Sequence, residues 1–200
     1  KYDSGEILFK EKKHSSSITK NIRAGFGMIP EDRRNQGLIP LLNINRNIAL
    51  TNYDYLCGGH GIVKRKHELA MCHKAIKQLD IRPNNPDLYV GNLSGGNQQK
   101  VVVGKWLMRN LKVLLIDEPT AGIDVGVKEE IYNLIENLAA KGVSVIIVSS
   151  DLKELLRISH RIIVLRHGRI FKEFNQGTVS QEDVLKAASG IRSGEAESID

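Results

Sequence analysis

The sequence is poor in cysteine and in long apolar runs. Its 200 residues contain only two cysteines, Cys57 and Cys72, which cannot build a disulfide framework and favour a reducing compartment. The longest apolar runs, near 113–116 and 143–148, are far shorter than the roughly 20 residues that a membrane-spanning helix needs. No basic and apolar leader opens the chain, so we expect any link to a membrane to go through a partner protein.

The net charge of +6 is spread along the chain, apart from one short cluster of lysines, Lys10, Lys12 and Lys13. A basic surface can attract nucleic acid, phosphates or anionic lipid. Dispersed positive charge is more typical of a solvated surface. The charge is thus only weak support for a nucleic-acid partner, and we expect none.

Apolar periodicity predicts alternating strands and helices in the second half of the chain. The expected strands are 113–116 and 143–148, both buried, followed by 161–165 and 169–174 with a turn at 167–168 between them. The expected helices are 95–109, 126–140, 152–158 and 180–188. This alternation is typical of an α/β fold in which helices cover a parallel sheet.

The first half mixes short strands with a helix-rich stretch. The expected strands are 5–9 and 27–30, the polar loops 11–17 and 31–37, and the helices 44–51 and 64–80. We therefore predict an α/β core formed by 1–38 and 95–188, a helical subdomain at 39–94 that ends with the loop at Ser94, and a flexible tail at 189–200.

Ser94, Gly95 and Gly96 come directly before an amphipathic helix. Serine is a good N-cap, and the two glycines leave backbone N–H groups open to an anion. The helix dipole and Lys100, one turn later, add positive charge. The pattern predicts a phosphate-binding helix N-terminus, although a capped helix after a flexible turn would explain Ser-Gly-Gly alone.

The apolar strand at 113–116 runs into two carboxylates, Asp117 and Glu118. Alternation along a strand points them in different directions. One can hold Mg²⁺ while the other orients an attacking water, and phosphoryl transfer needs both tasks. The Pro119-Thr120 pair and the loop at Asp124 argue against two unrelated surface acids.

These motifs resemble those of ABC-type ATPases, most closely the second nucleotide-binding domain of importers for ribose, galactose and xylose. The resembling segments are LSGGNQQKVVVGKWL, LLIDEPTAGIDVGVKEEIYNLI and VIIVSSDLKELL. The resemblance implies a P-loop NTPase fold with an inserted helical subdomain, and ATP and Mg²⁺ as cofactors. It implies that four residues contact ATP held by a partner domain, namely Ser94, Gly95, Gly96 and Gln98.

By the same resemblance, Asp117 is the Mg²⁺ ligand, Glu118 the catalytic base and Asp124 the D-loop residue that acts across a dimer. Two positions depart from the family pattern. Glu31 stands where a glutamine is usual, and Ser150 stands where a histidine usually contacts the γ-phosphate. Serine cannot take the charged role of imidazole. Both departures fit the second domains of sugar importers and suggest a weak or inactive site of the chain's own.

No Walker A loop, G-x-x-x-x-G-K-[ST], occurs in the sequence. We therefore expect an N-terminal truncation of roughly 60 residues on typical domain sizes, and poor binding and hydrolysis of ATP by these residues alone. The main duty expected of the chain is to lend its signature loop, residues 93–99 (LSGGNQQ), to a partner's site.

The resulting hypothesis is that the chain is the ATP-hydrolysing C-terminal half of an importer for a simple sugar, and that it lies peripherally at the cytoplasmic face of the membrane. Its expected partners are a second ABC domain, fused or identical, permease subunits and, indirectly, a sugar-binding protein. Two alternatives stay open: a soluble ABC ATPase acting on ribosomes or DNA, and a non-catalytic regulatory module, against which Glu118 argues. Arg33 and Arg34 belong either to a surface loop or to a contact with a membrane subunit.

Overall fold

The computed structural model describes residues 4–13, 17–57, 61–177 and 179–190. The chain divides into two compact units, Lys1–Val148 and Ser149–Asp200, and each is described by itself. Among the described residues, no helix combines the length and the apolar character needed to cross a membrane.

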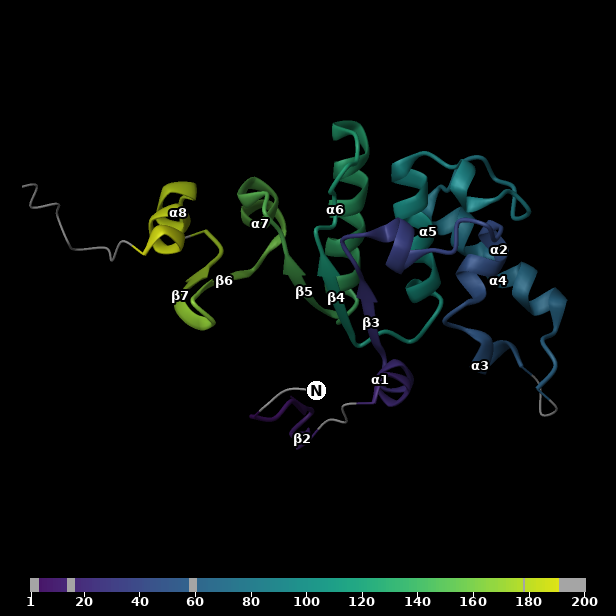
Figure 1. The fold of residues 1–200 in the computed structure, drawn as a ribbon, viewed down its shortest axis with the longest axis horizontal. Coiled ribbons are helices and arrows are strands. Elements are labelled where there is room, and N and C mark those ends of the chain that lie inside the picture. The colour runs from purple at the N-terminus through teal and green to yellow at the C-terminus, as the bar shows by residue number, and fades with distance from the viewer. Residues whose placement is uncertain (1–3, 14–16, 58–60, 178, 191–200) are drawn as a thin grey trace, which may run out of the picture. The chain divides into compact units, whose positions relative to one another are not determined.

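A three-stranded parallel sheet lies at the centre of the first unit, with β4 (Val113–Asp117) between β3 (Phe26–Ile29) and β5 (Ser144–Val148) (Figure 1). The register pairs Ile29 with Ile116 across β3 and β4, and Asp117 with Val148 across β4 and β5. Because all three strands run in the same direction, their carboxyl ends meet at one edge of the sheet. The predicted α/β class and parallel sheet are confirmed.

Two helices pack on this sheet, α5 (Gly95–Leu107) and α6 (Val125–Ala140). Leu114 and Ile116 of β4 line the same small interior space as Val103 of α5 and Ile131 of α6. All four side chains are buried, so this face of β4, to which Leu114 and Ile116 both point, packs against the two helices.

The helix-rich stretch before α5 packs on α5 itself. Its elements are α2 (Ile44–Ala49), α3 (Tyr53–Leu56), α4 (Arg65–Leu79) and the 3₁₀ turn η2 (Val90–Asn92). Cys72 and Ile76 of α4 are buried, as their helical spacing predicts, and burial raises the pKa of the Cys72 thiol to about 12. Since α5 contacts α2 and α4 as well as β3, the predicted subdomain boundary between 94 and 95 stays a prediction.

Three expectations for the first unit are wrong in detail. The stretch 5–9 contributes only β1 (Leu8–Phe9), which pairs with β2 (Lys12–Lys13) inside the expected polar loop, ahead of α1 (Ile18–Ala24). The polar loop 31–37 contains a short π-helical turn, η1 (Arg33–Gly37). The strand at 143–148 is not buried: Ile146 is 57% and Val148 61% exposed, because both lie on the sheet face opposite Leu114 and Ile116.

The second unit consists of α7 (Leu152–Ile158), the antiparallel hairpin β6 (Arg161–Arg166) and β7 (Arg169–Asn175), and α8 (Gln181–Ser189). Its core is formed by Ile162 and Val164 of β6 and by Val184 and Ala187 of α8. The predicted hairpin turn is confirmed. Of the predicted tail, residue 189 ends α8, and 191–200 lie outside the described residues.

Candidate nucleotide-facing site

Ser94 lies at the start of α5 in an extended conformation, with φ of −61° and ψ of 157°, and its side chain is exposed. The carbonyl of Ser94 accepts the first helical hydrogen bond, from the N–H of Gln98 at 2.9 Å. Within the described chain, the N–H groups of Gly95, Gly96 and Asn97 have no hydrogen-bond partner. Such orphan donors at a helix N-terminus favour an anion.

We expected the hydroxyl of Ser94 to cap α5, but it makes no cap hydrogen bond. Its Oγ accepts a hydrogen bond from Nδ2 of Asn97 at 3.0 Å, so the side chain of Asn97 takes the place of the backbone donor. Because Asn97 Oδ1 also accepts from the N–H of Arg82 at 2.7 Å, the amide links Ser94 to the segment that follows α4. The first backbone donors of the helix are thereby left open.

Lys100 does not add charge at this helix start, contrary to the expectation. Its ammonium is buried and forms a 2.5 Å ion pair with Glu130 of α6. It also donates to the carbonyl of Asp80 at 3.1 Å. Lys100 therefore ties α5 to α6, and of the two expected sources of positive charge at Ser94 the helix dipole remains.

Gln98 is only 2% exposed, and this burial does not fit the predicted contact with ATP. Its Nε2 donates to the carbonyl of Val90 at 3.2 Å, and its Oε1 accepts from Nε of Arg34 at 3.4 Å. Gln99 is buried as well and donates to the carbonyl of Pro119 at 3.0 Å. Both amides hold α5 against neighbouring backbone.

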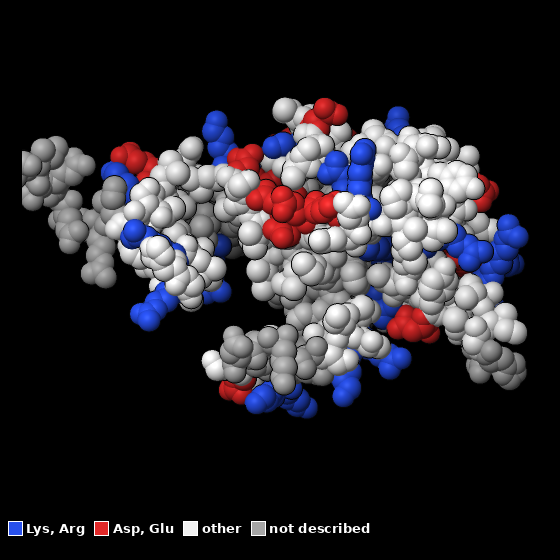
Figure 2. Space-filling model, in the orientation of Figure 1, with Lys and Arg blue, Asp and Glu red and all other residues white. Residues whose placement is uncertain are grey.

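Asp117 and Glu118 lie half-buried at the carboxyl end of β4. Glu118 has a φ of 49°, in the left-handed region that costs a non-glycine residue roughly 1–2 kcal/mol. Its N–H donates to the carbonyl of Val148 at 2.8 Å, which fixes the residue between the ends of β4 and β5. Strained backbone of this kind is concentrated at functional sites. Figure 2 shows acidic side chains gathered over this end of β4.

The donor set at Asp117 fits a Mg²⁺ ion that arrives with a nucleotide. Among the described residues, no group of three or more His, Cys, Asp or Glu side chains could hold a metal ion alone. A nucleotide-bound Mg²⁺ needs only one or two protein carboxylates, since phosphates and water complete its shell. Asp117 beside Glu118 meets that need and does not form a permanent metal cage.

The remaining predicted residues are spread over three loops. Glu31 is exposed on the loop after β3, and its carbonyl accepts from the N–H of Arg33 at 3.0 Å. Asp124 is exposed at the start of α6, where its carbonyl accepts from the N–H of Val127. Ser150 is exposed in the second unit, one residue before Asp151, which caps α7.

Arg33 was predicted only as a surface or partner-contacting residue, and the structure gives it a further role. Its Nη1 donates to the carbonyl of Ala121 at 2.7 Å, and its Nη2 to that of Gly122 at 3.2 Å. Burial, and secondly the charge of Arg34, lower the pKa of Arg33. No sequence pattern marks this link, because backbone carbonyls carry no residue signature.

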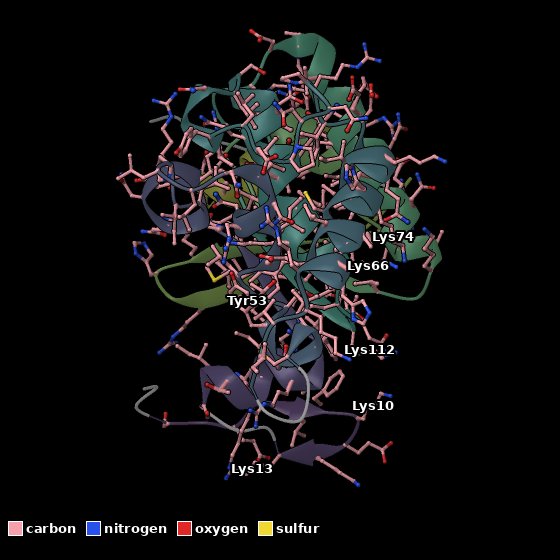
Figure 3. The ribbon with its side chains drawn as sticks, turned by 90° about the vertical axis from the view of Figure 1, so that its right-hand side faces the viewer. Lys10, Lys13, Tyr53, Lys66, Lys74 and Lys112 are labelled. Carbon is pink, nitrogen blue, oxygen red and sulfur yellow. The ribbon has the colours of Figure 1, made fainter. Side chains whose placement is uncertain are left out.

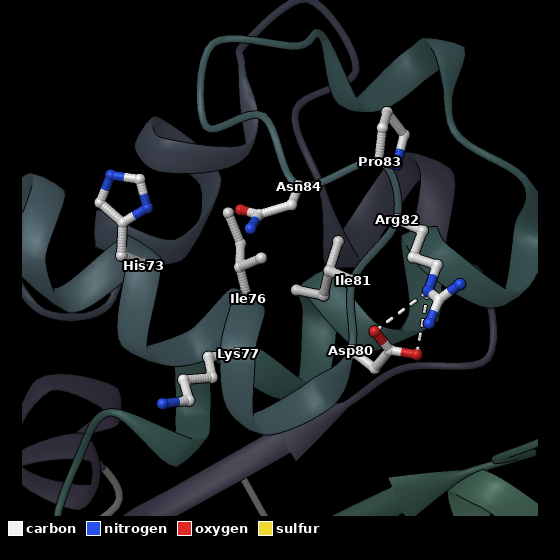
Figure 4. A pocket seen from close by; sticks show the side chains of 8 residues that line it. All are labelled: His73, Ile76, Lys77, Asp80, Ile81, Arg82, Pro83 and Asn84. Atoms are coloured by element: carbon white, nitrogen blue, oxygen red, sulfur yellow. Dashed lines mark hydrogen bonds and ion pairs between the residues drawn. The ribbon is translucent and has the colours of Figure 1, made fainter.

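A hollow of about 880 Å³ lies at the end of α4 (Figure 4). It is lined by His73, Ile76, Lys77, Asp80, Ile81, Arg82, Pro83 and Asn84. Asp80 and Arg82 form an ion pair at its wall, with Nε and Oδ2 3.0 Å apart. None of the residues expected to act on ATP lines this hollow. The candidate nucleotide-facing residues lie instead at the strand ends and at the start of α5.

Comparison with known proteins identifies the family. The family model described as "ABC transporter" matches residues 1–121. The chain belongs to the ABC transporter family. The signature loop at Ser94 and the strand ending in Asp117 both lie within the matched residues.

Curated ABC relatives include two sugar-import proteins. The "Xylose import ATP-binding protein XylG" of Thermoanaerobacter pseudethanolicus is 44% identical over 187 residues, which cover 93% of this chain and 37% of that protein. The "Ribose import ATP-binding protein RbsA" of Streptococcus agalactiae is 42% identical, over 95% of this chain and 39% of that protein. The chain thus spans less than two fifths of these relatives.

The fold is also similar to solved ABC cassettes. The dimeric cassette MJ0796, solved in a post-hydrolysis state with ADP and Pi, gives a TM-score of 0.71 at 23% identity. The match covers 86% of this chain and 74% of that cassette. At this identity the likeness establishes the fold alone.

Proposed function

We propose that this ABC chain is the ATP-hydrolysing C-terminal half of an importer for a simple sugar. Its main contribution is the start of α5, offered to ATP that a partner domain binds. The observation that carries the proposal is the exposed Ser94 followed by three unpaired backbone N–H groups on a helix that is firmly packed behind them. An anion binds well at such a helix start.

Two further features support this division of labour. Ser150 and Glu31 replace the histidine and glutamine usual in the family, which weakens the chain's own site. The sugar-import relatives are similar over more than nine tenths of this chain.

Asp117 and Glu118 are proposed to serve the chain's own nucleotide site. Asp117 would hold Mg²⁺, which would offset the negative charge of the phosphates, and Glu118 would accept a proton from the attacking water. Asp124, exposed at the start of α6, would act across the interface with the partner domain. The complete assembly would comprise a second ABC domain, permease subunits and an indirectly associated sugar-binding protein, with this chain peripheral at the cytoplasmic face.

The test is ATP turnover by the full-length gene product assembled with its partner subunits. Ser94→Ala should abolish most of the turnover, because the hydroxyl and its neighbouring N–H groups face the partner's ATP. Ser17→Ala, at the start of α1, is a matched control, since that serine also makes no side-chain cap and lies outside the ABC motifs. Full turnover in Ser94→Ala would refute donation of the signature loop.

A soluble ABC ATPase acting on ribosomes or DNA is the second candidate, favoured by the net charge of +6. Lys66, Lys74 and Lys112 reach outward on one side of the first unit (Figure 3). Fractionation of cells that express the tagged protein separates the two candidates. We expect recovery with membranes, and salt-sensitive recovery with ribosomes or DNA would favour the second.

A further inference from the structure

The loop after β3 and the turn after β4 are joined by one side chain. Arg33 reaches across 88 positions of sequence to the carbonyl of Ala121 and donates to the neighbouring carbonyl of Gly122 as well. The planar guanidinium offers two parallel donors to two carbonyls in a fixed geometry. A lysine ammonium is a single charged centre and cannot match that arrangement.

The start of α5 meets the same point. A Cβ atom added at Gly95 would lie 2.8 Å from Nη2 of Arg33 and 3.3 Å from the carbonyl oxygen of Gly122. A Cβ is essentially never found at the first of these distances, so the guanidinium packs directly on the backbone of Gly95. Three segments that are distant in sequence therefore converge on Arg33.

A second connection runs in parallel. The buried Nε2 of Gln99, one turn into α5, donates to the carbonyl of Pro119 at 3.0 Å. The turn 119–122 is thus attached to α5 through Gln99 and to the start of α5 through Arg33. With two attachments, movement of the turn relative to Gly95 would break hydrogen bonds.

We propose that Arg33 is a positioning residue that holds the start of α5 and the turn 119–122 in one arrangement. The two elements would then be presented together to the partner's ATP. The inference rests on the proposed donation of the signature loop. Arg33 acts through Gly95 and the turn, because both of its terminal nitrogens already donate to carbonyls within the chain.

The experiment uses the full-length assembly with Glu118→Gln in every variant, so that the remaining turnover comes from the partner's site. Arg33→Met should lower kcat roughly tenfold or more, since small misplacement of catalytic groups has effects of this size. The KM for ATP should stay within about twofold if binding to the partner is untouched. Arg33→Lys should lower kcat as much as Arg33→Met does. Arg23→Met, which changes an exposed residue of α1, should leave kcat unchanged.

Hydrogen exchange gives a readout that does not depend on activity. The N–H groups of Ala121 and Ile123 are bonded within the turn, to Glu118 and Thr120. Their exchange should become faster in Arg33→Met and Arg33→Lys and stay unchanged in Arg23→Met.

Three outcomes would overturn the inference. Unchanged exchange in Arg33→Met would show that the turn does not depend on this residue. Retained turnover in Arg33→Lys would show that charge, and not the paired donors, is what matters. Normal turnover in Arg33→Met together with a dead Ser94→Ala would leave the proposed function standing without this role, whereas an active Ser94→Ala would refute the proposed function itself.

Discussion

The ion pair between Arg109 and Asp54 is expected to be a main support of the helical part of the first unit. Arg109 follows α5, and its two terminal nitrogens donate to the two carboxylate oxygens of Asp54 at 2.7 and 2.8 Å. Nη1 also donates to the carbonyl of Thr51, and the guanidinium stacks 4.5 Å from the ring centre of Tyr55. Asp54→Asn removes the charge and leaves the shape nearly unchanged.

The magnitude follows from the burial of the two partners. Removing one partner of a buried pair costs about 3–5 kcal/mol, because the other charge stays buried, whereas an exposed pair is worth about 0–1 kcal/mol. The side chain of Arg109 is 2% exposed and that of Asp54 is 36% exposed, so water screens the carboxylate. We therefore expect the free energy of unfolding of the first unit to fall by about 2 kcal/mol.

Urea denaturation at neutral pH, followed by the fluorescence of Trp106, measures this change. Trp106 is the only tryptophan and is buried in the first unit. Asp80→Asn is the matched control, because the Asp80–Arg82 pair has a similar 3.0 Å distance but side chains that are 66% and 76% exposed. Equal effects of the two substitutions would refute the argument from burial.

The same pair gives a pH dependence with a definite sign. The hydrogen bond from Arg109 lowers the pKa of Asp54 below its ordinary value of 3.8. The unfolded chain therefore binds more protons in the acid range, and the contribution of Asp54 is complete above pH 3.8. It is lost as the pH falls through the lowered pKa, so the difference between wild type and Asp54→Asn should shrink there.

Three further predictions concern other buried groups. Burial lowers the pKa of Lys105 from 10.5 to about 8, so the unfolded chain binds more protons than the folded chain between these pH values. The free energy of unfolding should therefore rise with pH in this range. Lys105→Met should remove that rise, as urea titrations at two pH values would show. Gly96→Ala brings a Cβ to 2.9 Å from Val127 Cγ1 and should destabilise by about 1 kcal/mol, with Val127→Ala restoring most of the loss in thermal denaturation. Iodoacetamide should modify the half-buried Cys57 in the native chain and leave the buried Cys72 intact until urea unfolds it, as mass spectrometry would show.

Periodicity predicted most of the elements because their cause is local. The helix at 152–158 has the predicted bounds, and the strand pair around His167-Gly168 is where the pattern placed it. Apolar spacing and turn residues act within a few positions, so they can be read along the chain. The predicted burial of 143–148 is wrong, because burial depends on what covers each face of a strand, and Ile146 and Val148 lie on the sheet face opposite Leu114 and Ile116.

The candidate site was predictable in its backbone and less so in its side chains. Ser94 precedes a helix and Asp117 ends a strand, as the motifs indicate. The sequence did not predict that Asn97 would bond the hydroxyl of Ser94, or that Lys100 would turn away to Glu130. These side-chain contacts depend on groups that only the packing brings close, namely Arg82 for Asn97 and α6 for Lys100.

The sequence by itself determined the order of strands and helices, the family motifs and the placement of Asp117 and Glu118 after a buried strand. Only the tertiary structure decided which segments are held together, and Arg33 is the sharpest case. Its partners are the carbonyls of Ala121 and Gly122, and every residue type carries such a carbonyl. Recognition of that kind leaves no trace in residue identity and becomes visible only when the fold brings position 33 to the turn after β4.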